Sequence, residues 1–479
     1  MLVRLVLLVS ELITVISLLK RFYIMFETIK NCFKVKEIRK KIFITLILLL
    51  IFRLGCYIPV PGIKVAQFKD VIESGNYSFL EILTDITGGS LANATLFALG
   101  ISPYINASII IQLLTVGIPA LERLSKQGEE GRKKIAQITR YVTILLALAQ
   151  AIGIVVNFGL QNDAINLATF GHYKDGSGVS AAGAKWMAGI FLAVVYTAGA
   201  MLVMWIGERI TEYGVSNGIS LIIFIGIIST AGLTIVRKFK AGFTGTTSAF
   251  WELLGFAILT VLEFTAIVAV DLSERRIPVQ YAKQVKGRKM YGGQSSIIPI
   301  KISGSGVMPL IFAFAIISFP QMIISLFWPN SSANSGLNEW FSASGAWYGQ
   351  LIYMVVLCLL IFAFAFFYQS MQFNPEDVSK TIQQNGGFIQ GIRPGRPTAD
   401  YLKKISNRIT LFGAIYLSLV AFIPSLISMI ALSVLNVTDT TLLSVFSTTG
   451  ILIVVSVALE LDKQLESQLM MKNYKGFLK

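Results

Sequence analysis

Long apolar segments, separated by shorter polar stretches, recur along almost the whole chain. As helices with a rise of about 1.5 Å per residue, they are long enough to cross most or all of a hydrocarbon core about 30 Å thick. The pattern therefore predicts an all-α polytopic membrane protein with ten transmembrane helices. They cover residues 42–58, 103–119, 138–158, 186–206, 219–236, 250–270, 306–327, 348–368, 409–432 and 442–459.

The second of these segments is apolar but contains residues that interrupt helices. The chain from Gly88 to Pro119 reads GGSLANATLFALGISPYINASIIIQLLTVGIP, and Pro103 lacks the N–H group that a continuous helix would use. A broken helix is tolerated in a bilayer only where protein or a water-filled cavity surrounds it. We predict a short half-inserted helix over about 80–97, a hinge, and a full helix from Pro103.

The seventh segment carries a matching interruption. Gly306 and Pro309 lie near its start, with the same spacing as Gly100 and Pro103 in the second segment. Ten helices divide naturally after the fifth, so each half contains one broken helix near its beginning. Paired interruptions of this kind are typical of inverted repeats with a transport path between the halves.

Polar side chains inside the apolar segments should face other helices or water, because lipid disfavours them. Arg53, near the end of the first segment, can reach the interface or pair within the helical bundle. Glu263 is an intramembrane carboxylate, which is by default a functional candidate, but the sequence assigns it no role. The second segment is interrupted by three polar residues, Asn106, Ser108 and Gln112.

Composition and charge agree with a membrane protein. The chain is 54% hydrophobic and 14% charged, whereas soluble domains contain about 25% charged residues. Of the 41 Lys and Arg residues, 33 fall on one set of alternate loops and the termini, seven fall on the other loops, and the last is Arg53. Because Lys and Arg favour cytoplasmic loops, this asymmetry predicts that both termini are cytoplasmic. The net charge of +15 is compatible with nucleic-acid binding, but in a membrane protein it more often reflects such a bias of the cytoplasmic loops.

The chain offers little for catalysis or metal binding. His172 is the only histidine, and Cys32, Cys56 and Cys358 show neither a pairing pattern nor metal-ligand spacing. No GxxxxGK[ST] phosphate-binding motif occurs in the sequence, so the chain is not its own ATP-driven motor. We expect no enzymatic activity, no metal and no cofactor.

Two stretches give the chain a specific resemblance. The run SPYINASIIIQLL in the second segment and the motif GIRPG at 391–395 are similar to those of the SecY family (SecY/Sec61-alpha), the central channel subunit of the bacterial Sec translocase. The resemblance covers the chain from about Met25 to the C-terminus. It implies a clamshell of ten helices in two inverted, pseudo-symmetric halves, open on one side to lipid, with a half-inserted plug helix.

The resemblance also implies a function. A channel of this family translocates unfolded secretory proteins across the cytoplasmic membrane and releases membrane proteins sideways into the lipid bilayer. Its expected partners are the SecE and SecG subunits, the SecA motor ATPase, the ribosome, signal peptides and nascent chains. Two other interpretations stay open: an accessory SecY for specialised substrates, and a small-solute secondary transporter, which also favours inverted repeats and broken helices.

Position-by-position matching with the family places a ring of aliphatic side chains in the pore. Such a ring blocks ions by dewetting and carries no charge that would hold a passing peptide. All six positions are isoleucine in this chain, as that mechanism requires. They are Ile101, Ile105, Ile219, Ile223, Ile311 and Ile453.

The resemblance assigns the plug to about 83–95 and a lateral-gate role to Gln112. Small side chains would let a short plug helix sit loosely and leave, although they also serve close helix packing. The Gln112 amide, facing a neighbouring helix, would weaken an apolar seam so that signal sequences can part it. The alternative for Gln112 is a structural role, in which its amide makes a hydrogen bond to a neighbouring helix. The small plug residues are Gly88, Gly89, Ser90, Ala92 and Ala94.

Two long inner loops, 271–301 and 371–404, carry the residues that the family would use to contact SecA and the ribosome. Basic side chains interleaved with Tyr281 and Tyr291 can neutralise rRNA phosphates or anionic lipid, although a solvated charge run is the ordinary alternative. The residues with this assignment are Arg275, Arg276, Lys283, Arg288 and Arg393.

The chain divides along these features. Residues 1–24 form an atypical extension, for which we favour a mis-called start over the alternative of a genuine extra helix. Residues 25–41 form a basic amphipathic segment on the cytoplasmic side. The two halves cover 42–240 and 241–459, and the tail 460–479 is expected to be cytoplasmic.

Overall fold

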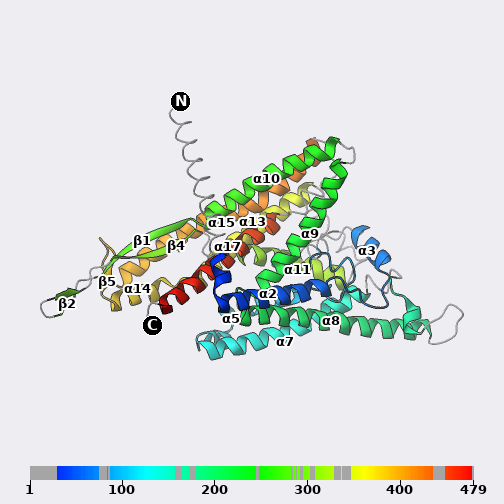
Figure 1. The fold of residues 1–479 in the computed structure, drawn as a ribbon, viewed down its shortest axis with the longest axis horizontal. Coiled ribbons are helices and arrows are strands. Elements are labelled where there is room, and N and C mark those ends of the chain that lie inside the picture. Colours follow the sequence, from blue (N-terminus) through cyan, green and yellow to red (C-terminus); the bar gives the residue numbers. More distant parts are fainter. Residues whose placement is uncertain are drawn as a thin grey trace.

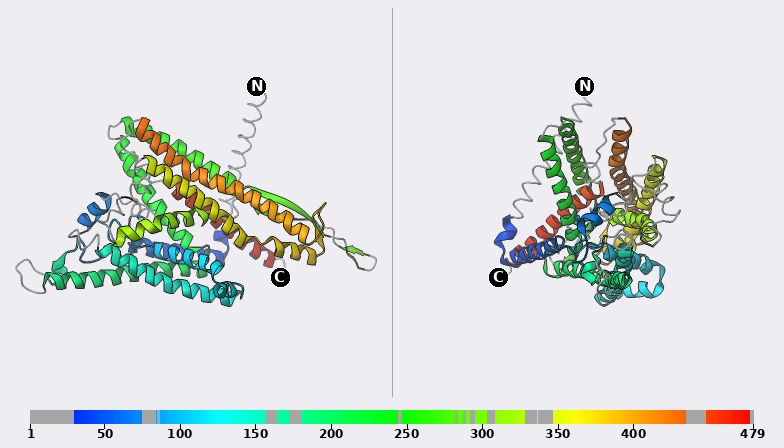
Figure 2. Two further views of the ribbon diagram at one scale, coloured as in Figure 1. Left: turned by 180° about the vertical axis from the view of Figure 1, so that it is seen from behind. Right: turned by 90° about the vertical axis from the view of Figure 1, so that its right-hand side faces the viewer.

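The computed structural model describes the helical body and most of its connections. The described residues are 30–74, 84, 87–156, 164–171, 180–243, 247–281, 284–286, 289–291, 295–302, 308–327, 336, 347–434 and 448–476. In Figure 1 the helices pack into an elongated bundle, and β-strands project from one of its ends. The helices of the two halves lie on opposite sides of the bundle, with α9 (Gly218–Phe243) running between them (Figures 1 and 2).

The first half begins with α2 and ends with α9. Local chemistry sets some of the helix ends. Pro103 lies in the first turn of α5, where backbone N–H groups have no acceptor within the helix, so its missing N–H costs no hydrogen bond. Ser180 caps α8 by accepting a hydrogen bond from the Gly183 N–H. The elements are α2 (Lys36–Gly55), α3 (Val65–Ser74), α5 (Ser102–Gly117), α6 (Pro119–Ser125), α7 (Glu129–Ile154), the 3-10 helix η2 (Leu167–Phe170), α8 (Ala181–Tyr213) and α9.

The second half combines long helices with a small sheet. The sheet has the order β4-β1-β5, with β1 antiparallel to both neighbours, and β2 pairs with β3 at the tip of the hairpin. The helices are α10 (Thr247–Asp271), α11 (Met308–Phe327), α13 (Trp347–Gln372), α14 (Pro375–Gln384), α15 (Arg396–Val434) and α17 (Thr448–Gly476). The strands are β1 (Glu274–Tyr281), β2 (Gln284–Lys286), β3 (Lys289–Tyr291), β4 (Ser295–Lys301) and β5 (Gly387–Phe388).

Each of the ten predicted apolar segments overlaps a helix of the structure. Among the described residues, four helices are long and apolar enough to cross a membrane, in α7, α8, α13 and α15, and the pair α5 and α6, bent by 105°, makes a fifth if counted as one span. Several helices extend beyond the predicted segments: α15 spans 39 residues, and α17 continues through most of the predicted tail. Hydrophobicity marks the membrane-embedded part of a helix, whereas its end depends on caps and backbone bonding.

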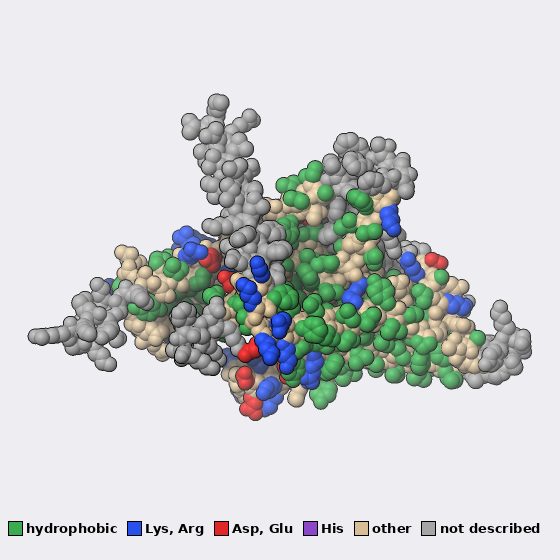
Figure 3. Space-filling view, viewed as in Figure 1, with side chains coloured by type: hydrophobic (Ala, Val, Ile, Leu, Met, Phe, Trp, Pro, Cys, Tyr) green, Lys and Arg blue, Asp and Glu red, His purple; other side chains and the backbone are tan. Residues whose placement is uncertain are grey.

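The outer surface of the helices is strongly apolar. On α2, the side chains of Leu46, Leu50 and Leu54 are between 56% and 59% exposed. Figure 3 shows hydrophobic side chains spread over the helical body. Because soluble monomers rarely expose broad apolar surfaces, this surface suits contact with lipid.

The largest hydrophobic core joins the two halves. Buried side chains of α2, α5, α8 and α9 belong to one cluster with side chains of α10, α11, α13, α15 and α17. A second cluster lies within the first half, around α7 and α8. Since apolar burial is the main favourable term in packing, the first cluster holds the two halves against each other.

The structure corrects the half-inserted helix predicted over 80–97 in its second part. Residues 87–101, named here the turn segment, form turns with a single β-bridge residue, Thr95; upstream, residue 84 is helical, and 80–83 and 85–86 lie outside the described residues. Gly88, Gly89 and Gly100 adopt φ values of 70°, 82° and 53°. These values lie in the left-handed region, which a right-handed helix excludes. The glycines thus prevent the segment from becoming helical.

Backbone hydrogen bonds fix the turn segment to the chain that follows α2. The Val60 N–H donates to the Ala94 carbonyl oxygen at 3.0 Å, and the Leu96 N–H donates to the Ile58 carbonyl oxygen at 3.0 Å. These bonds satisfy polar backbone groups that would otherwise be unpaired in an apolar surrounding. The turn segment is therefore a docked part of the first half.

The two inner loops predicted at 271–301 and 371–404 are folded. Along β1, Ile277 and Val279 are buried and the residues between and before them are exposed, which is the period-two pattern of a strand with one covered face. We name β1–β5, α14 and the start of α15 the hairpin module. Its buried core consists of Ile277, Val279, Ile300, Ile382, Ile389 and Leu402.

Pro309 does not break its helix. It is the second residue of α11, as Pro103 is the second residue of α5. Both prolines therefore lie in a first turn, where the fixed φ and the missing N–H are tolerated. The predicted correspondence between the halves is present as two matching helix starts, and the proline inside α11 is Pro320.

Candidate functional site

The six predicted ring residues all belong to the hydrophobic cluster that joins the two halves. They come from α9, α11 and α17 and from the start of α5. Ile101, Ile223 and Ile453 are buried, with exposed fractions of 2%, 5% and 7%, and Ile105, Ile219 and Ile311 are partly buried in the same cluster. The fold thus brings together side chains from distant parts of the sequence.

Three of these residues also line one cavity, with a volume of about 700 Å³. Ile223, Ile311 and Ile453 come from three different helices and form an apolar part of its wall. The remaining wall is mostly polar. Its polar residues are Asn217, Ser220, Asp271, Lys301, Tyr368, Gln372, Ser456, Glu460, Lys463, Gln464, Ser467 and Gln468.

Ile101 and Ile219 meet beside α8. A Cβ atom placed on Gly207 would lie 3.5 Å from Ile219 Cγ1 and 3.6 Å from Ile101 Cδ1. These are ordinary van der Waals distances, so the two isoleucines approach the same point on α8. The fold therefore brings predicted ring residues together at two places, three of them at the cavity and two at Gly207.

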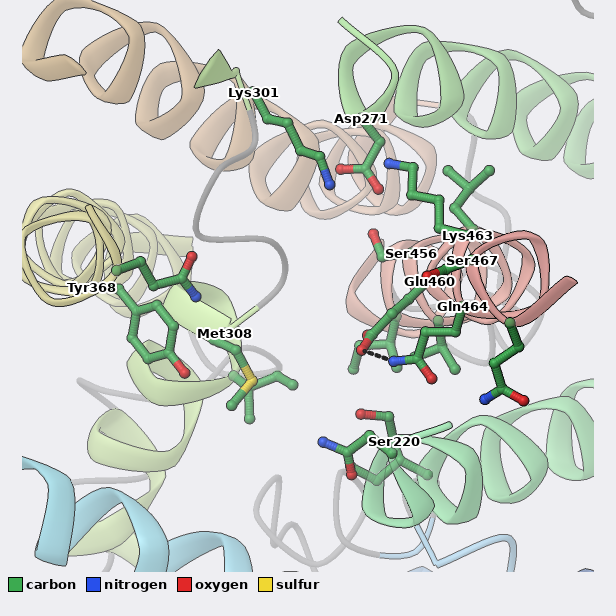
Figure 4. Close-up of a pocket in the computed structure, with 18 of the residues that line it drawn as sticks. Ser220, Asp271, Lys301, Met308, Tyr368, Ser456, Glu460, Lys463, Gln464 and Ser467 are labelled. Atoms are coloured by element: carbon green, nitrogen blue, oxygen red, sulfur yellow. Dashed lines mark hydrogen bonds between the residues drawn. The ribbon is translucent and has the colours of Figure 1, made fainter. Parts of the chain in front are cut away.

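Charged residues of both signs surround the polar end of the cavity. In Figure 4, Lys301 and Lys463 reach towards Asp271, which ends α10, and Glu460 accepts a hydrogen bond from Gln464 Nε2 at 3.2 Å. Glu460 lies just past the predicted span 442–459; burial raises the pKa of its carboxyl, and the ammonium groups of Lys301 and Lys463 oppose that shift. The cavity is therefore lined by two carboxylates, two ammonium groups and uncharged polar side chains, with isoleucines on one part of its wall.

Sequence analysis did not single out the polar wall of α17. Ser456, Glu460, Lys463 and Ser467 recur at spacings of four, three and four residues, so they share one helix face. This period could have indicated that α17 turns a polar face towards water beyond the membrane.

The small residues of the turn segment are packed tightly. Ser90 is fully buried; its Oγ donates to the Thr87 carbonyl oxygen at 2.8 Å, and its carbonyl oxygen accepts from Thr95 Oγ1 at 3.1 Å. Ala92 and Ala94 are buried as well. In this state, small side chains allow close packing and not the loose fit expected of the plug.

Arg53 pairs within the bundle, which was one of its two predicted options. Its Nη2 donates a hydrogen bond to Ser229 Oγ on α9, and its guanidinium lies over the Tyr57 ring, 5.5 Å from the ring centre. Arginine combines a fixed planar set of donors with affinity for aromatic faces, so it suits a site of this kind. Ser229 could not have been identified from the sequence, because its partner is 176 residues away.

The side-chain amide of Gln112 donates a hydrogen bond within its own helix. Its Nε2 donates to Ser108 Oγ, one turn earlier on α5, at 3.1 Å. Residues four apart on a helix face each other, so a local acceptor was available to the amide. The bond lies within one helix, and the lateral-gate role of Gln112 stays a prediction.

The described basic residues assigned to docking lie on the hairpin module. Arg275 and Arg276 are exposed on β1, and Arg276 Nε pairs with Glu274 Oε1 at 2.8 Å. Arg393 is exposed in the turn before α15, where Thr398 Oγ1 donates to its carbonyl oxygen at 2.8 Å. Lys283 and Arg288 lie outside the described residues.

Glu263 has no observed partner. Both of its carboxylate oxygens are buried and lack a hydrogen bond within the described part of the chain. In the same part, no group of three or more His, Cys, Asp or Glu side chains is arranged to hold a metal ion.

Comparison of the sequence with known proteins gives full-length matches. The matching family model is described as SecY and covers residues 95–461. The chain is 40% identical to the protein translocase subunit SecY of Streptomyces galbus over 460 residues, which cover 95% of this chain and 100% of that protein. It is 38% identical to the subunit of the same name from Staphylococcus carnosus (strain TM300) over 457 residues, covering 95% and 99%.

Comparison with solved structures gives the same fold. "The structure of a protein conducting channel" superimposes with a TM-score of 0.62 at 18% identity, covering 90% of this chain and 92% of that one. Sec61 in the canine ribosome-channel complex from the endoplasmic reticulum gives a TM-score of 0.60 at 17% identity, with coverage of 90% and 92%. At these identities the likeness shows the fold alone.

Proposed function

The chain belongs to the SecY family, and from this we infer that it is the protein-conducting channel subunit of a protein translocase. It is a multi-pass membrane protein that translocates unfolded secretory proteins and releases membrane proteins into the bilayer. The observation that carries this function is the cavity between the halves, where Ile223, Ile311 and Ile453 form the apolar wall of a polar space.

The chemistry of the cavity suits an extended polypeptide. Its polar wall offers both hydrogen-bond donors and acceptors, so a peptide backbone can enter the cavity without leaving its own polar groups unpaired. The aliphatic ring has no fixed charge that would hold a passing side chain, and a narrow apolar constriction excludes ions when it is empty of peptide. A chain can therefore pass where a hydrated ion does not.

Membership of the family assigns two further parts of the channel, the plug and the lateral gate. The plug, assigned to about 83–95, includes residues 87–95 of the turn segment, and α5 forms one wall of the path, with Gln112 at the lateral gate. The turn segment is hydrogen-bonded to the chain after α2 and leads directly into α5, the helix that carries Ile105, which supports this assignment.

The chain works without enzymatic activity of its own, and its energy comes from partners. The hairpin module docks SecA or the ribosome through Arg275, Arg276 and Arg393 at the cytoplasmic face, and the family resemblance assigns the same role to Lys283 and Arg288. Small SecE and SecG subunits complete the channel. The protein resides in the cytoplasmic membrane with both termini inside, as the Lys and Arg distribution indicates.

Protease protection of a signal-bearing preprotein tests this function. The vesicles contain the full chain with SecE, and SecA plus ATP is added outside. We expect protected preprotein only when all components are present, because the chain supplies the path and SecA the energy. If no preprotein is protected in vesicles where a known translocon succeeds, the housekeeping function is wrong. The accessory channel then becomes the first alternative, and the transporter the second.

Arg393→Ala is expected to slow SecA-driven translocation about tenfold, the effect of losing about 1.4 kcal/mol of a charge-assisted contact. The 391–395 turn should keep its shape, since Ser379 Oγ still donates to the Gly395 carbonyl oxygen at 2.6 Å. Arg396→Ala, an exposed arginine at the start of α15, is the matched control and should have little effect. Equal rates for the two variants would remove Arg393 from the docking surface.

A further inference from the structure

Arg53 lies where α2, α9 and the turn segment meet. It extends from α2, its Nη2 donates to Ser229 Oγ on α9, and Tyr57 lies under its guanidinium. A guanidinium is planar, so a bond at one nitrogen and a ring against its face together fix the direction of the other nitrogen. The direction of Nη1 is therefore set by contacts that do not involve the turn segment.

Nη1 lies against the turn segment at Gly88. A Cβ atom built on Gly88 would be 2.5 Å from Arg53 Nη1 and 3.2 Å from the Cα and carbonyl oxygen of Gly226. Any side chain at this position would collide with the arginine and crowd the backbone of α9. The φ of 70° at Gly88 also favours glycine. The chain can thus pass between Arg53 and Gly226 only where it has no side chain.

The same face of α9 carries the ring. Ile219, Ile223 and Gly226 follow one another at spacings of four and three residues, which places them on one side of the helix. The contact with the turn segment is therefore made by the helix face that also presents two ring isoleucines. A displacement of the turn segment changes the packing of that face directly.

We propose that Arg53 is a positioning residue: held by Ser229, it forms with Gly226 a seat that keeps the turn segment in the closed position. This inference rests on the proposed function, in which the plug includes residues 87–95 of the turn segment. Gly88 fits this seat because it has no side chain. Through the seat the plug contacts both α2 and α9, the helix that carries Ile219 and Ile223.

The seat also allows release. Nη1 is buried and has no hydrogen-bond partner among the residues that the structure describes. A buried charged donor without an acceptor is unfavourable, and water can supply the acceptor once the segment leaves. The closed position is thus favoured by packing at Gly88 and opposed by the unpaired N–H, so it is held reversibly.

A pair of glycine variants tests the seat. The readout is the ion leak of vesicles that contain the full chain and its small partner subunits, without preprotein. Gly88→Ala and Gly89→Ala impose similar backbone strain, because the φ values are 70° and 82°. Among the described residues, however, a Cβ on Gly89 would meet only Asn93 Nδ2, at 3.9 Å. We expect Gly88→Ala to raise the leak about tenfold over Gly89→Ala, as the segment is forced from its seat.

Arg53→Gln and Ser229→Ala test the same seat from its other side. Each is expected to raise the leak about tenfold, and the double variant no further than either, because both remove one interaction. This pair carries the test if Gly88→Ala fails to assemble. Equal ion leaks for Gly88→Ala and Gly89→Ala, or additive effects of Arg53→Gln and Ser229→Ala, would overturn the proposed role of Arg53.

Preprotein translocation by the unsubstituted chain separates the two hypotheses. If the unsubstituted chain translocates nothing, the proposed function is wrong. If it translocates normally and Gly88→Ala leaks no more than Gly89→Ala, the function stands and only the seat is wrong. An increased leak with preserved SecA-driven translocation supports both, since a merely misfolded channel would lose translocation as well.

Discussion

Ile453→Asn is expected to raise the ion leak of the resting channel by about tenfold to a hundredfold. An amide buried without a partner is unfavourable by about 1–3 kcal/mol, and water entering the constriction removes that penalty. The wetted state therefore gains about one to two powers of ten in population. Because ions cross only a wetted constriction, the leak rises with it. The measurement is the decay of a preset potassium gradient across vesicles without preprotein.

The position of Ile453 explains why the effect is large. Its side chain is 7% exposed on α17 and lines the cavity together with Ile223 and Ile311. An asparagine at this position would place a polar amide between the apolar constriction and the polar cavity. Ile311→Asn is expected to act in the same way, because Ile311 lies on the same wall from α11.

Two controls separate sealing from stability. Ile453→Val keeps an aliphatic side chain and should keep the seal. Val455→Asn also buries an amide on α17, at a residue that is 2% exposed but does not line the cavity. It should destabilise the protein without a comparable leak. A leak from Ile453→Asn no greater than from Val455→Asn would contradict the ring assignment.

Leu402→Ala is expected to open the hairpin module and to abolish most partner-driven translocation. Leu402 is fully buried at the start of α15, where it packs in the core formed with Ile277, Val279 and Ile382. Truncation of a buried leucine costs about 2–5 kcal/mol, which increases the open fraction of a module about thirtyfold or more. Limited proteolysis within 274–301 should speed up accordingly, and SecA-driven translocation should fall.

The resting ion leak is the control measurement for this prediction. The core of the hairpin module and the ring belong to different hydrophobic clusters, so the resting leak should not change. Ile297→Ala, at a β4 residue that is 53% exposed, is the matched control and should leave both proteolysis and translocation nearly unchanged. If Leu402→Ala translocates at the normal rate, the hairpin module is not the docking surface for the motor.

Local chemistry explains how far the sequence could predict this fold. Each apolar segment coincides with a helix, because hydrophobic side chains mark the parts of a helix that lipid or a core will accept. Pro103 and Pro309 each lie in the first turn of a helix, since proline acts through its own ring and the adjacent turn; Pro309 was wrongly expected to break its helix. The strands of the hairpin module were missed because the abundance of charge favoured a loop over the alternation around Ile277 and Val279.

The ring residues show the value and the limit of the family resemblance. Ile101 and Ile453 are ordinary aliphatic residues within apolar segments, and no local property distinguishes them from residues that face lipid. Family positions selected them, and the structure placed all six in one cluster, three of them on one cavity.

By itself, the sequence determined the class of protein, the positions of its helices, the interruptions at Gly100 and Pro103, and its family. These depend on composition, on hydrophobic period and on the local conformational limits of glycine and proline. Only the tertiary structure decided that the turn segment is not helical and that Gln112 bonds within α5. It alone brought Arg53 to Ser229 and Gly88, because contacts between distant segments depend on how whole helices pack.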